Sequence, residues 1–262
     1  MAPNRILVEQ SGHVVRVIIN HPERRNAIGY EMWRALGDAL AAIAENEEVQ
    51  VVILTGAGDK AFCAGNDISE FSEWMSSKQK HEKYDRQSNR AVRLLQALAK
   101  PVIARIHGVC VGGGFELAQL CDIQIAADDA RFGVTPAKLG IGYSLNDTTL
   151  LTDRIAARFV RELLYTGRMF GAKDALRMGI VNQVVPADKL DETVDGYASE
   201  IAGNAPLSIR ASKIIITQAL PPDGKRDLAL CERIVDACRN SDDAAEGRRA
   251  FSEKRRPVFR GK

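Results

Sequence analysis

Apolar positions along the chain change period several times, and each change predicts a different element. Residues 5–10 and 13–20 are short β-type runs, with Ser11-Gly12 between them as a two-residue hairpin signal. Residues 30–46 carry apolar side chains at a helical spacing. Residues 49–55 are continuously apolar, which is typical of a strand buried on both faces of a parallel sheet.

The middle of the chain continues this alternation. A polar helical segment over about 69–99 is expected to end at Lys100-Pro101, because proline disfavours helix in the residue before it. Two apolar strands are expected over 102–107 and 122–127, with a helix over 114–121 between them. Strands that alternate with helices predict an α/β domain with crossover helices.

Helical patterns dominate from about residue 148, and one strand-like run over 180–185 interrupts them. We therefore expect an α/β core over 1–200 and a helical C-terminal region over 201–262, with a gradual boundary and one functional unit. The helical patterns cover 148–165, 172–178, 188–202, 206–219, 225–239 and 242–253.

Composition excludes some classes of function. The chain has 262 residues, enough for a full α/β core, and 36 Lys and Arg against 34 Asp and Glu leave a net charge of +2. A balance so close to neutral favours neither nucleic acid nor a membrane surface as a partner. The last residues are locally basic, which fits either a solvated tail or capture of a phosphate-bearing ligand.

The five cysteines form no CxxC pair and no Cys/His cluster, so no metal site is predicted. The N-terminus lacks the apolar core of a signal peptide, and no run approaches the ~18 apolar residues of a transmembrane helix. These features lead us to expect a cytoplasmic protein.

Gly112, Gly113 and Gly114 follow an apolar run and open a helix that carries Glu116. The first amides of a helix lack an intrahelical partner and lie at its positive end, so this turn can hold a ligand oxygen beside a carboxylate. A dinucleotide site is disfavoured, because GxGxxG would need a glycine where Leu117 stands. The alternative for Glu116 is a first-turn acid that only stabilises the helix.

A second glycine turn follows the buried strand over 49–55. Gly65 permits an unusual backbone conformation that would point the Asn66 N–H outward, and Asp67 can accept hydrogen bonds that lock the turn. Two such turns supplying one N–H each would make the two-donor arrangement of an oxyanion hole.

Together these segments resemble the crotonase superfamily, the enoyl-CoA hydratase/isomerase family, over nearly the whole chain. Five motifs carry the resemblance in order: HPERRNAI over 21–28, AFCAGNDI over 61–68, the block over 100–122, the AxxAxxxGI stretch over 172–180 with Val184-Val185-Pro186, and FSEKRRPVF over 251–259.

The resemblance implies a spiral of ββα units with a C-terminal helical region that drives formation of a homotrimer or hexamer. It also implies an acyl-coenzyme A substrate and no separate cofactor. The thioester oxygen would lie on the Asn66 and Gly113 backbone N–H groups, with Glu116 as acid/base. The residues that it places along the coenzyme A moiety are Ala64, Asp67, Ile68, Arg24, Arg25, Phe251 and Lys254, the last two from this subunit or a neighbour.

The sequence departs from the hydratase pattern at one position. Pro136 stands where the family's second catalytic glutamate is expected, and proline cannot move a proton. The run over 135–143 resembles instead the methylmalonyl-CoA decarboxylase branch, whose active-site tyrosine matches Tyr143, although Asn66 stands where that branch has histidine. Asp147 is either a helix cap or a substitute carboxylate, and Tyr143 either a catalytic hydroxyl or a packed aromatic.

Three hypotheses follow. The first is a lyase or isomerase of the hydratase/isomerase family that uses Glu116. The second is a decarboxylase-like enzyme that relies on Tyr143 and the oxyanion hole. The third is an acyl-CoA-binding protein without turnover.

Overall fold

The computed structural model describes residues 5–74, 76–220 and 225–262. Its strands are β1 (Ile6–Ser11), β2 (Val14–Ile19), β3 (Val51–Gly56), β4 (Ala61–Cys63), β5 (Val102–Ile106), β6 (Val109–Val111), β7 (Ile123–Ala127), β8 (Arg131–Gly133), β9 (Phe170–Gly171) and β10 (Gln183–Val185). Its α-helices are α1 (Tyr30–Glu45), α2 (Phe71–Trp74), α3 (Lys78–Ala97), α4 (Gly113–Leu120), α5 (Leu145–Thr152), α6 (Ala157–Thr166), α7 (Ala172–Arg177), α8 (Leu190–Ala202), α9 (Pro206–Ala219), α10 (Leu228–Arg239) and α11 (Asp242–Ser252).

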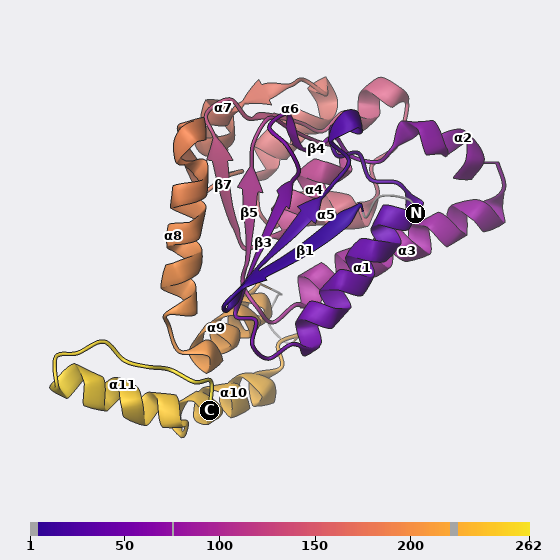
Figure 1. Ribbon diagram of the computed structural model, residues 1–262. Helices are drawn as coiled ribbons and strands as arrows, with labels where there is room; N and C mark the ends of the chain where they lie inside the picture. Colours follow the sequence, from indigo (N-terminus) through magenta and orange to yellow (C-terminus); the bar gives the residue numbers. More distant parts are fainter. Residues whose placement is uncertain (1–4, 75, 221–224) are drawn as a thin grey trace.

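A six-stranded sheet forms the centre of the fold, in the order β1-β2-β3-β5-β7-β10 (Figure 1). β1 and β2 form the predicted antiparallel hairpin, and the remaining neighbours pair in parallel. The turn is Gly12-His13, one residue later than expected, because Ser11 still pairs with Val14. Gly12 has a φ of +57°, which a glycine adopts without steric cost.

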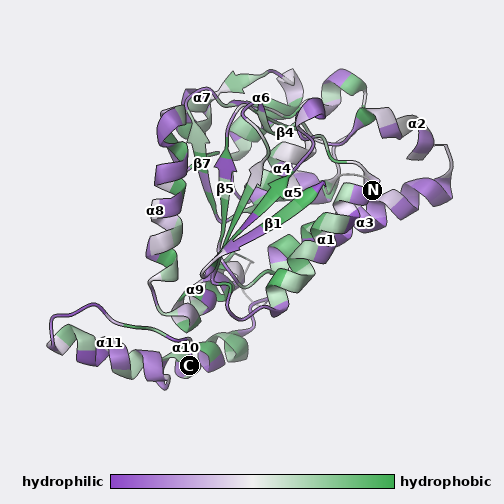
Figure 2. Ribbon diagram, viewed as in Figure 1, coloured by the Kyte–Doolittle hydropathy of each residue, from purple (hydrophilic) through white to green (hydrophobic). Residues whose placement is uncertain are grey.

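Helices cover both faces of this sheet, as the continuous apolar run of β3 predicts. Val51 and Ile53 pack in the cluster that includes α8, and Val52 and Leu54 face the larger cluster that includes α1. Figure 1 places α8 along one side of the sheet and α1 with α3 along the other. In Figure 2 the central strands are largely hydrophobic (green), whereas hydrophobic and hydrophilic (purple) residues alternate along the outer helices.

A second, four-stranded sheet was not predicted. Its order is β4-β6-β8-β9, with β4, β6 and β8 parallel and β9 antiparallel. Strands of two or three residues are too short to show a period of two, so only tertiary pairing reveals them. The strand that leads into the Gly112 turn is therefore β6, and β5 ends earlier at Ile106.

Two of the expected long helices are interrupted. The segment over 69–99 contains a 3-10 turn over Ile68–Glu70, then α2 and α3, and the Ser77 side chain caps α3 by accepting a hydrogen bond from the Lys80 N–H. The segment over 148–165 divides into α5 and α6. The Ser77 cap starts a new helix because it satisfies an amide that has no intrahelical partner.

The C-terminal helices α9, α10 and α11 extend below the sheet, away from its upper edge (Figure 1). Apolar side chains are exposed along them, with Ile216 62%, Leu220 65% and Leu228 66% accessible. Within the described residues no helix is both long and apolar enough to cross a bilayer, and no group of His, Cys, Asp and Glu could hold a metal ion.

Candidate active site

The two predicted glycine turns meet in space. Gly65 has a φ of +92°, and a Cβ added to it would lie 3.1 Å from Val111 O and 3.3 Å from Gly113 N. A Cβ added to Gly113 would lie 3.8 Å from Asn66 N. Glycine at position 65 thus permits both the left-handed conformation and the close approach of the two backbones.

Two backbone donors at this junction have no partner among the described residues. Gly113 is the first residue of α4, where an N–H has no intrahelical acceptor. Asn66 bridges to Ile28, but the bonds of that bridge run from Ile28 N to Gly65 O and from Asp67 N to Ile28 O, and they leave the Asn66 N–H unused. Two adjacent N–H groups of this kind can bind one oxygen that carries negative charge.

The loop over 21–28 holds the first turn in place. Asn26 is fully buried, and its Nδ2 donates to Ala57 O at 2.9 Å and to Ala61 O at 2.7 Å. Arg25 O accepts from Ala64 N at 2.9 Å. The N-terminal motif therefore fixes the backbone that precedes Asn66.

Helix α4 is anchored on the small sheet by its first turn. A Cβ on Gly114 would lie 2.3 Å from Cys63 O, so only glycine allows α4 to pack directly on β4. Phe115 packs edge-on against Phe132 and Phe170, which stack on each other at 5.7 Å. These contacts set the rotation of α4 about its axis. Glu116 is the residue that follows Phe115 in the chain.

Glu116 and Tyr143 form a hydrogen-bonded pair, in which the Tyr143 hydroxyl donates to Glu116 Oε1. Burial raises the pKa of Glu116 to about 7, the Tyr143 hydrogen bond opposes this rise, and the charge of Asp147 adds to it. The pKa of Tyr143 lies well above its ordinary value, chiefly through burial and then through the Glu116 charge. A carboxyl group of this pKa exchanges protons readily near neutral pH.

Asp147 does not cap α5. The cap is Ser144, whose Oγ accepts from Asp147 N at 3.1 Å and donates to Asp147 Oδ2 at 2.5 Å. The interpretation of Asp147 as the cap is therefore wrong, because the cap lies three residues earlier in the chain. Pro136 begins a 3-10 turn over Pro136–Leu139 and offers no titratable group.

Asp67 locks its turn as predicted. Its Oδ1 accepts from Ser69 N at 3.0 Å and Ser69 Oγ at 2.7 Å, and Arg24 Nη1 donates to the same oxygen at 3.1 Å. Burial would raise the pKa of Asp67, but these hydrogen bonds and the Arg24 charge outweigh it and leave the pKa below its ordinary value. The carboxylate therefore stays ionised.

The remaining predicted residues divide into two groups. Ala64 is half-buried in the turn, and Ile68, 63% accessible, lies just beyond it. Phe251, 89% accessible on α11, and Lys254 lie in the C-terminal region, away from β4 and α4 of the same chain (Figure 1). One copy of the chain does not bring these two residues to Arg24 and Arg25.

Two residues of the site were not predicted. Trp33 on α1 and Tyr84 on α3 are buried, and both contact the side chain of Asn66. The sequence showed Trp33 only as one of the apolar positions of a helix. A buried tryptophan N–H needs an acceptor, which was the available signal, but the acceptor lies 33 residues away.

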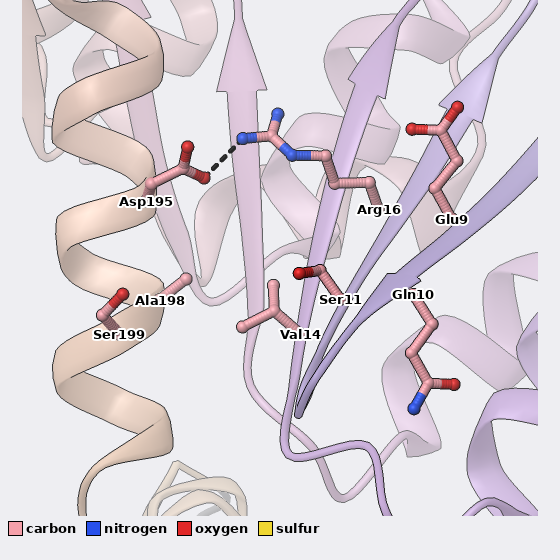
Figure 3. Close-up of a pocket in the computed structure, with 8 residues that line it drawn as sticks. All are labelled: Glu9, Gln10, Ser11, Val14, Arg16, Asp195, Ala198 and Ser199. Atoms are coloured by element: carbon pink, nitrogen blue, oxygen red, sulfur yellow. Dashed lines mark hydrogen bonds and ion pairs between the residues drawn. The ribbon is translucent and has the colours of Figure 1, made fainter.

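A separate cavity of about 540 Å³ opens between the β1–β2 hairpin and α8 (Figure 3). Arg16 pairs with Asp195 at this cavity, and Glu9 is the third charged residue of its lining. The cavity adjoins neither glycine turn, and the chemistry described above lies outside it.

Comparison with known proteins places the chain among relatives of one family. The Enoyl-CoA hydratase/isomerase family model matches residues 9–262. A short-chain-enoyl-CoA hydratase of Clostridium acetobutylicum is 36% identical over 98% of this chain and 97% of its own. An (E)-benzylidenesuccinyl-CoA hydratase of Thauera aromatica is 34% identical over 98% of this chain and 99% of its own. The crystal structure of an enoyl-CoA hydratase/carnithine racemase from Magnetospirillum magneticum superimposes with a TM-score of 0.93 at 35% identity, covering 100% of this chain and 97% of that one.

Proposed function

Because the chain belongs to the enoyl-CoA hydratase/isomerase family, we propose that it converts an acyl-coenzyme A thioester through an enolate. The Asn66 and Gly113 N–H groups hold the thioester oxygen, and Glu116 moves the proton. The observation that carries the proposal is the pair of unused N–H groups beside a half-buried carboxyl of pKa about 7.

One carboxyl group can serve the two steps of hydration in turn. The oxygen of water bonds to C3, the C2=C3 electron pair moves onto the thioester oxygen, and Glu116 accepts the proton that water loses. Glu116 then returns this proton to C2 as the enolate collapses. Isomerisation needs only that the same carboxylate takes a proton from C2 and delivers it to C4. Neither sequence requires a second carboxylate at Pro136.

The coenzyme A moiety is proposed to lie along Ala64, Asp67 and Ile68. A cavity of about 280 Å³ is lined by residues of the loops that precede this segment, and its charged residues are Arg25, Lys60, Glu23 and Asp59. Arginine and lysine suit the phosphate groups of coenzyme A. Arg24 contributes by holding Asp67, and no cofactor besides the thioester itself is required.

Decarboxylation is a second candidate, favoured by the Tyr143–Glu116 contact together with Pro136. Loss of CO₂ leaves its bonding electrons as the enolate, so no base has to remove a carbon-bound proton. The Tyr143 hydroxyl can orient the carboxylate before CO₂ leaves, or protonate C2 afterwards. The acyl group remains open, since relatives of similar identity are named for different acyl groups.

A mass-spectrometric screen of acyl-CoA thioesters tests the proposal. We expect one class of acyl thioester to gain or lose water, or to shift its double bond as separated by chromatography. Loss of CO₂ would instead select the decarboxylase mechanism. If no thioester is converted but calorimetry detects binding, the hypothesis of an acyl-CoA-binding protein without turnover is selected. Absence of binding to several acyl-CoAs would refute the proposal.

The pH profile separates the roles of Glu116 and Tyr143. As a base Glu116 must be ionised, so kcat/KM, which reports groups of the ligand-free enzyme, should rise with pH through about 7 and fall away below it. Tyr143→Phe removes a hydrogen bond that favours the ionised form, so the midpoint should move upward by about one pH unit. Tyr165→Phe is the control, because Tyr165 is 77% accessible. An unchanged midpoint in Tyr143→Phe would contradict the pairing.

We propose a homotrimer, or a hexamer built from trimers, as the active assembly. The exposed apolar side chains of α9 and α10 are the surface that would be covered. A neighbouring subunit could then bring Phe251 and Lys254 to the coenzyme A end. Light scattering on the purified protein gives the mass directly, and a monomer would exclude this assignment.

A further inference from the structure

The side chain of Asn66 is held in one orientation. Trp33 Nε1 donates to Asn66 Oδ1 at 3.1 Å, and the Tyr84 hydroxyl lies 3.3 Å from the same oxygen. An indole N–H is only a donor, so the atom that faces it must be the amide oxygen. Trp33 and Tyr84 are 4% and 5% accessible and are bonded to each other at 3.1 Å, so the clamp is part of the core.

The other end of this carboxamide is unused. Asn66 Nδ2 donates to no residue within the described parts of the chain, and Asn66 as a whole is half-buried. The fully buried side-chain atoms that lack a partner there are Gln50 Oε1 and His107 Nε2, so Asn66 Nδ2 faces accessible space. A Cβ on Gly113 would lie 3.6 Å from Asn66 Oδ1, which places the carboxamide beside the proposed oxyanion hole.

We propose that Asn66 Nδ2 is a specificity-determining donor that binds a neutral oxygen on C3 of the acyl chain. The inference rests on the proposed function, in which the backbone N–H of the same residue binds the thioester oxygen. In asparagine the backbone nitrogen and Nδ2 are separated by as many covalent bonds as the thioester oxygen and an oxygen on C3. A 3-hydroxyacyl thioester thus carries two oxygens at the covalent separation of these two donors.

The charges around the acyl site favour a neutral oxygen over a carboxylate. Glu116 lies one turn along α4 from Gly113, and Asp147 is close enough to act on both Glu116 and Tyr143. No basic residue in the described parts of the chain is paired with Glu116. A carboxylate on C3 would meet like charge, whereas a hydroxyl group there would not.

Binding of a matched ligand pair tests the inference. 3-Hydroxybutyryl-CoA and butyryl-CoA differ at C3 by the hydroxyl group, and calorimetry in a Glu116→Gln background prevents turnover. We expect the hydroxylated ligand to bind about tenfold more tightly, and Asn66→Ala to abolish that preference. Alanine keeps the backbone N–H, so the thioester contact is retained.

Trp33→Phe provides an independent variant. It removes the indole donor and frees the Asn66 carboxamide to rotate. The preference for the hydroxylated ligand should therefore decrease in part, although Asn66 itself is unchanged. Equal affinity for the two ligands before substitution, or an equal loss for both in Asn66→Ala, would overturn the inference while leaving acyl-CoA binding established. Failure of both ligands to bind would instead refute the proposed function.

Discussion

Glu116→Gln is expected to lower kcat about a thousandfold on the thioester that the screen identifies. Glutamine preserves the size of the side chain and can still accept the Tyr143 hydrogen bond, but it cannot exchange a proton. General acid–base catalysis contributes roughly 10²–10⁴-fold, and this chain has Pro136 where a second glutamate would share the task. Steady-state kinetics measure the effect.

Binding separates lost chemistry from lost structure in this variant. Calorimetry should find acyl-CoA affinity within about twofold of the parent, since the oxyanion donors and the coenzyme A contacts are untouched. Thermal unfolding should show no loss of stability, because a half-buried carboxyl with a raised pKa is replaced by a neutral amide. If Glu116→Gln kept its turnover and Tyr143→Phe abolished it, the acid/base role would belong to Tyr143.

Gly65→Ala is expected to lower kcat about a hundredfold. The added Cβ would lie 3.1 Å from Val111 O and 3.3 Å from Gly113 N, and both are main-chain atoms that cannot rotate away. Relief of that contact pushes the turn that carries Asn66 away from Gly113, and loss of one oxyanion donor costs about 10²–10³ in kcat. The measurement is kcat with KM on the same thioester.

Gly12→Ala is the matched control for this substitution. Gly12 also has a positive φ, +57°, but a Cβ there would meet nothing within 4 Å, and it lies in the β1–β2 turn. Both variants should unfold at a lower temperature because alanine is strained in this backbone region, by about 1–3 kcal/mol. Only Gly65→Ala should lose turnover. A comparable loss in Gly12→Ala would assign the effect to general destabilisation.

Much of the fold could be predicted from local pattern. The pattern of apolar positions predicted the hairpin, α1, the burial of β3 on both faces, α9 and α11. Each of these elements has a run long enough to show its pattern. The small sheet could not be predicted, since β4, β6, β8 and β9 have two or three residues each and exist through pairing between distant segments. The division of the segment over 69–99 also depended on a local cap at Ser77.

The sequence by itself determined the parts of the site whose chemistry is local. Positive-φ glycines at 65 and 112, an acid in the first turn of α4, and the carboxylate that locks the Asn66 turn all follow from residue type and spacing. Tertiary structure alone decided which of these parts meet. It set Gly113 against Asn66, Tyr143 on Glu116, and Trp33 with Tyr84 on the Asn66 amide. Backbone conformation depends on a residue and its neighbours, whereas a contact between distant segments depends on how the whole core packs.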